Sequence, residues 1–179
     1  FENDRTTAKI HIFKMDKDYR NLLGYLPQDF GVYPDFSVYD YLMYIATLKG
    51  IGYSAAKARV QEMLHLTGMT QHKNKKMKSL SGGMKRRAGI AQAVLNDPSV
   101  LILDEPTAGL DPSERIRFRN LISELASNRI VLLSTHIVSD IESVASQILL
   151  MKNGKFVATG TVDEILSSTP DKAWITKVP

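Results

Sequence analysis

The chain of 179 residues is long enough for one compact domain, and its 44% hydrophobic and 23% charged content is ordinary for a globular protein. No apolar run approaches the length of a membrane span. The chain contains no cysteine, which excludes disulfides, thiolate metal sites and a cysteine nucleophile, and favours a reducing compartment. Its net charge of +4 is concentrated in a basic cluster at residues 73–87, which fits a solvated surface or an anionic partner.

The first half of the chain predicts a strand followed by a helical segment. Residues 10–13 alternate in polarity and are a candidate edge strand, and residues 22–26 form a short apolar run stopped by a proline, which places Gln28 just past a strand end. Ser37 and Asp40 form a start like a capping box for the first helix. Helices are expected from residue 37 to near 50, at 54–66 and at 84–95.

The second half alternates strands and helices. An unbroken apolar run at 100–103 stops at Asp104 and Glu105, which indicates a buried parallel strand whose carboxyl end opens into a ligand site. Asp111 is the expected N-cap of a helix running to about residue 126. Further expected elements are a buried strand at 130–134, a helix at 138–144, a hairpin of strands 147–152 and 155–159 turning at Asn153-Gly154, and a short helix capped at Thr161. The pattern is that of an α/β sheet with a helical insertion.

Each polar feature has a plain structural explanation when it is taken alone, but their order and spacing resemble the ATP-binding-cassette (ABC) ATPase family. The matching stretches are residues 25–28 (Q-loop), 80–84 (signature), 101–107 (Walker B), 108–111 (D-loop) and 134–136 (H-loop). The resemblance runs from about Leu22 to the C-terminus. Within the family, the chain is similar to the ATPase subunits of bacterial ABC-2-type exporters of drugs or antimicrobial peptides.

The resemblance implies an α/β fold of the P-loop NTPase (RecA-like) type. The core would comprise residues 1–28 and 96–179, with an inserted α-helical subdomain at 29–95 that carries the signature. Two departures stand out. The phosphate-binding motif G-x-x-x-x-G-K-[ST] (Walker A) is absent, and Met84 replaces the usual glutamine of the signature. We therefore expect an N-terminally incomplete domain that, alone, binds ATP weakly or not at all and does not hydrolyse it.

The resemblance also assigns roles to single residues. Asp104 would hold Mg²⁺, with Gln28 as a second contact to the metal or the attacking water. Glu105 would orient or deprotonate that water, and His136 would contact the γ-phosphate. Gln28 joins the core to the helical lobe, so it could also report nucleotide occupancy to that lobe.

The remaining roles concern a head-to-tail dimer with two ATP molecules at its interface. Ser81, Gly82 and Gly83 at a helix N-terminus would bind the nucleotide held by the partner subunit, and Asp111 would lie at the same interface. The second ATPase subunit could be an identical or a different chain.

A transmembrane permease subunit is the other implied partner. Such a partner implies that the chain lies in the cytoplasm, peripheral on the inner face of the membrane. ATP binding and hydrolysis would there be coupled to transport, and to export in particular. The aromatic residues near the start of the helical lobe would either receive a coupling helix of the permease or pack the core; they are Tyr33, Phe36, Tyr39, Tyr41 and Tyr44.

Two alternatives remain open. One is a soluble ABC-type ATPase that acts on nucleic acid or ribosomes, which the basic stretch 73–78 suggests. The short interval from Gln28 to Ser81 and the lack of cysteine oppose it, so no nucleic-acid partner is expected. The other is a non-catalytic fragment or degenerate half, which the intact pair Asp104 and Glu105 and the intact His136 oppose.

Overall fold

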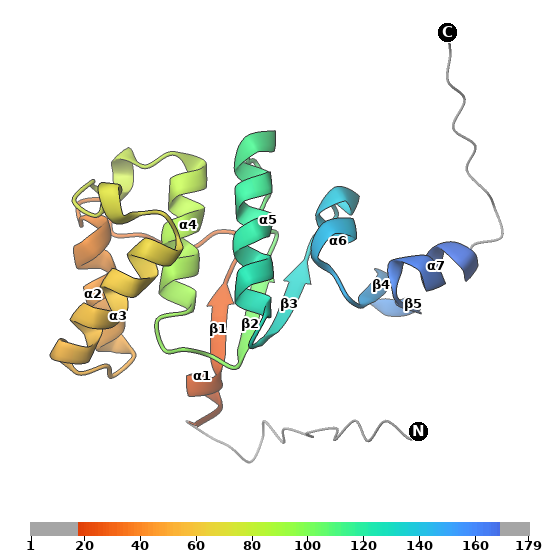
Figure 1. Cartoon of the computed structure of the whole chain (residues 1–179), viewed down its shortest axis with the longest axis horizontal. Helices are drawn as coiled ribbons and strands as arrows, with labels where there is room; N and C mark the ends of the chain where they lie inside the picture. The colour runs from red at the N-terminus through yellow and green to blue at the C-terminus, as the bar shows by residue number, and fades with distance from the viewer. Residues whose placement is uncertain (1–17, 169–179) are drawn as a thin grey trace, which may run out of the picture. The chain divides into compact units, whose positions relative to one another are not determined.

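The computed structural model describes residues 18–168 and divides the chain into two compact units, Phe1–Ser134 and Thr135–Pro179. Each unit is described by itself (Figure 1). The candidate strand at 10–13 lies outside the described residues. No helix within 18–168 is long and apolar enough to cross a membrane.

A parallel three-stranded sheet forms the centre of the first unit. After a short helix α1 (Asp18–Leu22), the strands are β1 (Leu23–Leu26), β2 (Val100–Asp104) and β3 (Ile130–Ser134), in the order β1-β2-β3. The register is continuous across the sheet, with Leu26 beside Leu103 and Leu103 beside Leu133. The predicted α/β class with parallel strands is therefore confirmed.

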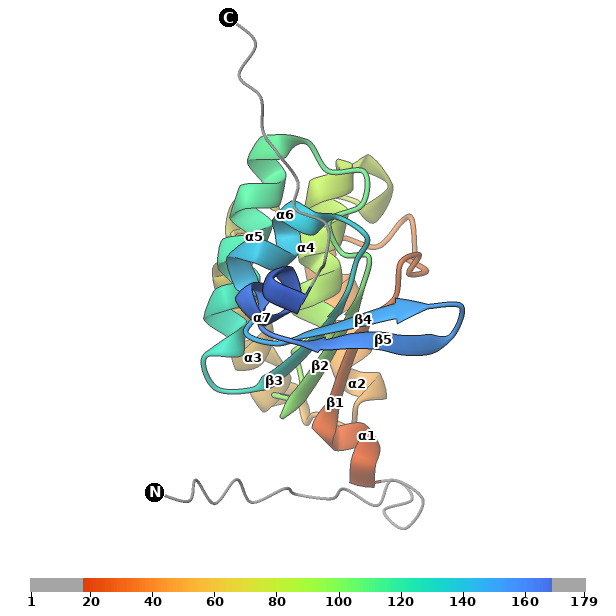
Figure 2. The ribbon, with the colours of Figure 1, turned by 90° about the vertical axis from the view of Figure 1, so that its right-hand side faces the viewer.

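Helices cover one face of this sheet. The helix α4 (Gly82–Ala93) contacts β1 and α5 (Pro112–Ala126) contacts β3, and both lie on the same side of the strands (Figure 2). The residues of β1 and β2 that point to this side, such as Leu26 and Leu103, have no exposed surface. The core of the first unit therefore lies between the sheet and its helices.

The opposite face of the sheet is more exposed than the sequence predicts. The apolar sequence of β3 predicts a strand buried on both faces, but its residues alternate between exposed and partly buried. Leu132 is 50% exposed, and Tyr25 of β1, which is aligned with it through Ile102 of β2, is 51% exposed. Parallel strands are rich in apolar residues because both faces are normally covered, and here the described helices cover only one.

The helical segment between β1 and β2 follows the predicted order. It contains α2 (Val38–Leu48), α3 (Tyr53–Leu66), two short 3₁₀ turns at Thr70–His72 and Met77–Ser79, and α4. Ser37 caps α2 by accepting a hydrogen bond from the Asp40 N–H at 3.0 Å, and its hydroxyl donates to the Asp40 carboxylate at 2.6 Å. The predicted capping pattern is thus confirmed, while α4 begins two residues earlier than expected.

Tyr41 fastens α2 to α4 inside this segment. Its side chain is 1% exposed, and its hydroxyl donates to the Gln92 amide oxygen. Burial raises the pKa of Tyr41 to about 12 because a phenolate would lose its hydration there.

The second unit holds α6 (Val138–Val144), the antiparallel hairpin of β4 (Ile148–Lys152) and β5 (Lys155–Gly160), and α7 (Val162–Ser168). Asn153 and Gly154 both have positive φ, 49° and 74°, as a tight two-residue hairpin turn requires. The predicted hairpin is confirmed. Thr161 and Glu164 cap α7 reciprocally, with each backbone N–H donating to the other's side chain.

The shifted pKa of Tyr41 makes stability depend on pH. The unfolded chain deprotonates Tyr41 near the ordinary pKa of 10, whereas the folded chain keeps the proton to about 12, so the free energy of unfolding should fall as pH rises between these values. We expect a loss of roughly 1 to 3 kcal/mol in urea unfolding across this interval that is absent in Tyr41→Phe. Tyr53→Phe, at a residue that is 70% exposed, is the matched control. An equal loss in Tyr41→Phe and the wild type would contradict this account.

Candidate functional site

Polar side chains gather at the carboxyl ends of the parallel strands. Asp104 is the last residue of β2 and Ser134 is the last residue of β3, and the two are cross-strand neighbours. The Ser134 hydroxyl donates to the Asp104 carboxylate at 2.5 Å. Gln28 follows β1 by two residues, so the topology places it at the same edge of the sheet. Sequence reasoning predicted Asp104 and Gln28 here but missed Ser134.

Glu105 turns the chain sharply away from β2. Its φ is +45°, the left-handed region, which costs a non-glycine residue about 1 to 2 kcal/mol. Its backbone N–H still donates to the Ser134 carbonyl at 3.0 Å, and its own carbonyl accepts from the Ala108 N–H at 3.2 Å. Strained backbone of this kind concentrates at functional sites, where the surrounding structure holds it. Nothing in the sequence indicated this conformation.

A compact turn leads from Glu105 to the start of α5. Gly109 has φ of +73°, and the Leu110 N–H donates to the Thr107 carbonyl at 3.2 Å. Asp111 then caps α5, as predicted, by accepting from the Glu114 N–H at 2.9 Å and from the Ser113 hydroxyl at 2.8 Å. The hydrogen bond from the Glu114 N–H, followed by that from Ser113, lowers the pKa of Asp111, which is therefore an exposed carboxylate at neutral pH.

The N-terminus of α4 carries the predicted signature residues. Ser81 is the N-cap and its hydroxyl oxygen accepts from the Met84 N–H at 3.3 Å. The first turn of a helix leaves backbone N–H groups without partners inside the helix, and here these include Gly82 and Gly83. A Cβ added at Gly82 would meet none of the described residues 18–168 within 4 Å, so their packing does not require glycine at this position.

Two arginines of α4 have partners elsewhere in the first unit. Arg86 donates to the Pro27 carbonyl at 3.3 Å, next to Gln28, and Arg87 pairs with Glu114 of α5 at 2.5 Å. Part of the basic cluster that the sequence singled out is therefore structural, because it joins α4 to the end of β1 and to α5.

The aromatic residues divide between core and surface. Tyr41 is core, whereas Tyr33, Phe36 and Tyr44 form a cluster with ring centroids 5.1 to 5.9 Å apart. Tyr33 is 46% exposed and Phe36 is 36% exposed. Core packing thus explains Tyr41 and also Tyr39, which is partly buried against the core, whereas Tyr33, Phe36 and Tyr44 form a partly exposed surface of the helical lobe.

His136 lies two residues past the end of β3 and belongs to the second unit. Its predicted contact with the γ-phosphate therefore remains a prediction.

The oxygen donors at the strand ends suit magnesium. Among residues 18–168, no group of three or more histidine, cysteine, aspartate or glutamate side chains could hold a metal by itself. Magnesium does not need such a group, because it is bound through one or two carboxylates together with water and substrate phosphates. Asp104, with a fixed carboxylate, and the amide oxygen of Gln28 fit this donor set.

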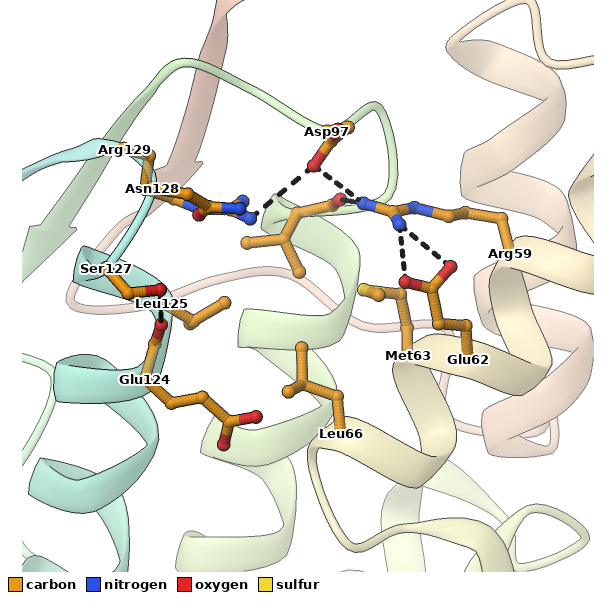
Figure 3. Close-up of a pocket in the computed structure, with 11 residues that line it drawn as sticks. Arg59, Glu62, Met63, Leu66, Asp97, Glu124, Leu125, Ser127, Asn128 and Arg129 are labelled. Atoms are coloured by element: carbon orange, nitrogen blue, oxygen red, sulfur yellow. Dashed lines mark hydrogen bonds and ion pairs between the residues drawn. The ribbon is translucent and has the colours of Figure 1, made fainter.

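A cavity of about 320 Å³ lies elsewhere, beside the residues that precede β2 and β3 (Figure 3). There Asp97 pairs with Arg59 at 3.1 Å and with Arg129 at 3.4 Å. Arg59 also donates to the carbonyls of Val94 and Leu95, which directly follow α4. Because these ion pairs hold α3, the end of α4 and the start of β3 together, we interpret this cavity as structural. It lies at the opposite end of the strands from Asp104.

Comparisons with known proteins agree with this geometry. A family model described as "ABC transporter" matches residues 2–108. The uncharacterised ABC transporter ATP-binding protein YxlF of Bacillus subtilis (strain 168) is 36% identical over 160 residues, which cover 89% of this chain and 54% of the relative. The Nod factor export ATP-binding protein I of Burkholderia orbicola (strain AU 1054) is 35% identical over 150 residues, covering 83% of this chain and 49% of the relative. The linearmycin resistance ATP-binding protein LnrL of Bacillus subtilis (strain 168) is 32% identical, covering 81% and 47%.

A solved structure is also similar. It is cbiO1 from Clostridium perfringens, part of the ABC transporter complex cbiONQ, with a TM-score of 0.75 and 29% identity, covering 83% of this chain and 61% of that one. The chain spans about half the length of the relatives it matches. The family model covers more than half of this chain, and the fold and the motif order agree with it. The chain therefore belongs to the ABC transporter family, among its ATP-binding proteins.

Proposed function

We propose that this chain supplies the acidic and signature parts of the ATP site in an ABC transporter subunit, and that ATP binding and hydrolysis there drive transport through a membrane partner. The observation that carries the proposal is the end of β2. Ser134 fixes the Asp104 carboxylate at 2.5 Å, and Glu105 leaves the strand in a strained left-handed turn. Such a pair positions two carboxylates for different tasks.

Within this proposal, Asp104 holds Mg²⁺ and Gln28 contacts the metal or the attacking water. When bound, Mg²⁺ neutralises the charge that develops on the transferred phosphate. Glu105 accepts a hydrogen bond from the attacking water and orients or deprotonates it. His136, which follows β3, donates to the γ-phosphate. Phosphoryl transfer requires positioning and charge neutralisation more than covalent chemistry, and these residue types supply both.

Ser81, Gly82 and Gly83 act on the nucleotide of a second subunit. The capped start of α4 presents backbone N–H groups and the positive end of the helix dipole, which favours an anion. The open surroundings of Gly82 support close approach by a ligand. Asp111, exposed and negatively charged, lies at the same subunit interface.

The domain boundaries and partners complete the proposal. Residues 1–28 and 96–179 form the core and residues 29–95 the helical lobe, whose aromatic cluster Tyr33, Phe36 and Tyr44 receives a helix of a transmembrane permease subunit. The chain then works at the inner face of the membrane, in a dimer of identical or related subunits. Export is the favoured direction because relatives include a Nod factor export protein and a linearmycin resistance protein.

The 179-residue chain carries no G-x-x-x-x-G-K-[ST] motif, so it should lack the main contacts to the β- and γ-phosphates. We expect isothermal calorimetry to detect no tight binding of Mg-ATP to this polypeptide, and phosphate release assays to detect no hydrolysis. A dissociation constant in the micromolar range would contradict this expectation.

Glu105→Gln tests the catalytic assignment. In a chimera that places a P-loop segment of a relative before this chain, the amide keeps the size of Glu105 but cannot accept the proton of water. Hydrolysis should fall by about a hundredfold or more, while ATP-dependent dimers accumulate in gel filtration. Ser123→Ala, on an exposed part of α5, is the matched control. A variant that hydrolyses ATP at the parental rate would refute the role of Glu105.

Replacing Ser81 separates helix capping from nucleotide binding. Ser81→Ala removes the cap and should lower the free energy of unfolding by about 1 kcal/mol. Ser81→Asp keeps a capping acceptor, so it should retain the stability of the wild type, but its charge should repel the partner's nucleotide and abolish ATP-dependent dimers of the chimera. Dimers that persist in Ser81→Asp would argue against the proposed role of the signature.

A further inference from the structure

One carboxylate joins two helices of the first unit. Glu114, in the first turn of α5, pairs through Oε2 with Arg87 of α4 at 2.5 Å and through Oε1 with Arg117 of its own helix at 3.0 Å. The side chains of Glu114 and Arg87 are only 20% and 19% exposed, whereas Arg117 is 67% exposed. The contact that is shielded from water is therefore the one between helices, and ion pairs gain strength with such shielding.

The same carboxylate packs against the signature. A Cβ added at Gly83 would lie 2.7 Å from Glu114 Oε2 and 3.2 Å from its Cγ. A side chain at Gly83 would therefore have to displace the side chain of Glu114. Gly82 differs, because the same addition there meets no atom of the described part of the chain within 4 Å.

The backbone of Glu114 extends the connection to the turn that follows β2. Its N–H donates to the Asp111 carboxylate at 2.9 Å. From Asp111 the chain runs back through the hydrogen-bonded turn of Thr107 and Leu110 to Glu105. Glu114 therefore contacts, at one position, the signature helix and the segment that begins at the strained Glu105.

We propose that Glu114 is a positioning residue that locks the signature turn at Gly83 and the Asp111 turn into one rigid unit. The inference rests on the proposed function, in which the signature and Asp111 face the nucleotide of the partner subunit while Glu105 acts on the chain's own. Through Glu114, a displacement of the signature on the partner's nucleotide reaches the turn that carries Glu105. The two ATP sites of the dimer are thereby linked through one ion pair.

Hydrogen-exchange mass spectrometry on the 179-residue chain tests this link without nucleotide. Glu114→Gln removes the ion pair but keeps the backbone hydrogen bond to Asp111. Backbone amides at 84–87 and at 108–111 should then exchange roughly tenfold faster, and together, while those at 100–104 keep their wild-type rates. Gly83→Ala, which displaces the Glu114 side chain, should raise exchange in the same two segments.

Controls separate positioning from general stability. Glu62→Gln breaks an ion pair with Arg59 in which the Glu62 side chain is 60% exposed, and this change should leave both segments unchanged. Arg87→Lys retains a cation and should keep most of the protection, whereas Arg87→Met, which has no charge, should lose it. A Glu114→Gln chain that exchanges like the wild type, loosens only in α5, or loosens uniformly through the first unit would overturn the proposal. Because no nucleotide is involved, these outcomes are independent of those of the chimera experiments.

Discussion

The parallel register between β2 and β3 sets Asp104 beside Ser134 and determines where the proposed magnesium and water ligands lie. The Ser134 hydroxyl holds the Asp104 carboxylate, and the Ser134 carbonyl holds the N–H of Glu105 as the chain turns out of the strand. A slip of one residue would point every side chain of β2 to the other face of the sheet and would move both acids. The apolar core around Leu101 and Leu103 fixes that register, so the packing of the core positions the site.

The helical lobe shares the apolar core with this sheet, and a few polar contacts tie the two together as well. Arg86 reaches the carbonyl of Pro27 beside Gln28, and Arg87 reaches Glu114 on α5. These contacts connect the start of α4, where a nucleotide of a second subunit would bind, to the strand ends that would hold the first nucleotide. Cations in the first turns of a helix oppose the helix dipole, and their pairing with a carbonyl and a carboxylate offsets that cost.

Periodicity and capping signals were sufficient to predict the parallel class, the hairpin, and the helix starts at Ser37 and Asp111. They failed where tertiary contacts decide the outcome. The apolar sequence of β3 carries no sign that one of its faces is exposed. The left-handed conformation of Glu105 could not be predicted either, because that conformation is typical of glycine or asparagine and not of glutamate. The roles of Ser134 and Glu114 were missed because a serine at the end of a strand and a glutamate in the first turn of a helix are both common. Their roles depend on Asp104 and Arg87, which are distant in the sequence.

The central claim is that the signature of this chain covers a nucleotide held by another subunit. The chain has no cysteine, so a single cysteine at Ser81 can report on that contact. The rate of maleimide modification of Ser81→Cys would be measured with a partner subunit that carries a P-loop and the Glu105→Gln change, with and without Mg-ATP. The account predicts strong protection of the cysteine only when partner and Mg-ATP are both present. Equal modification rates in all mixtures, with ATP shown to be bound to the partner, would contradict it.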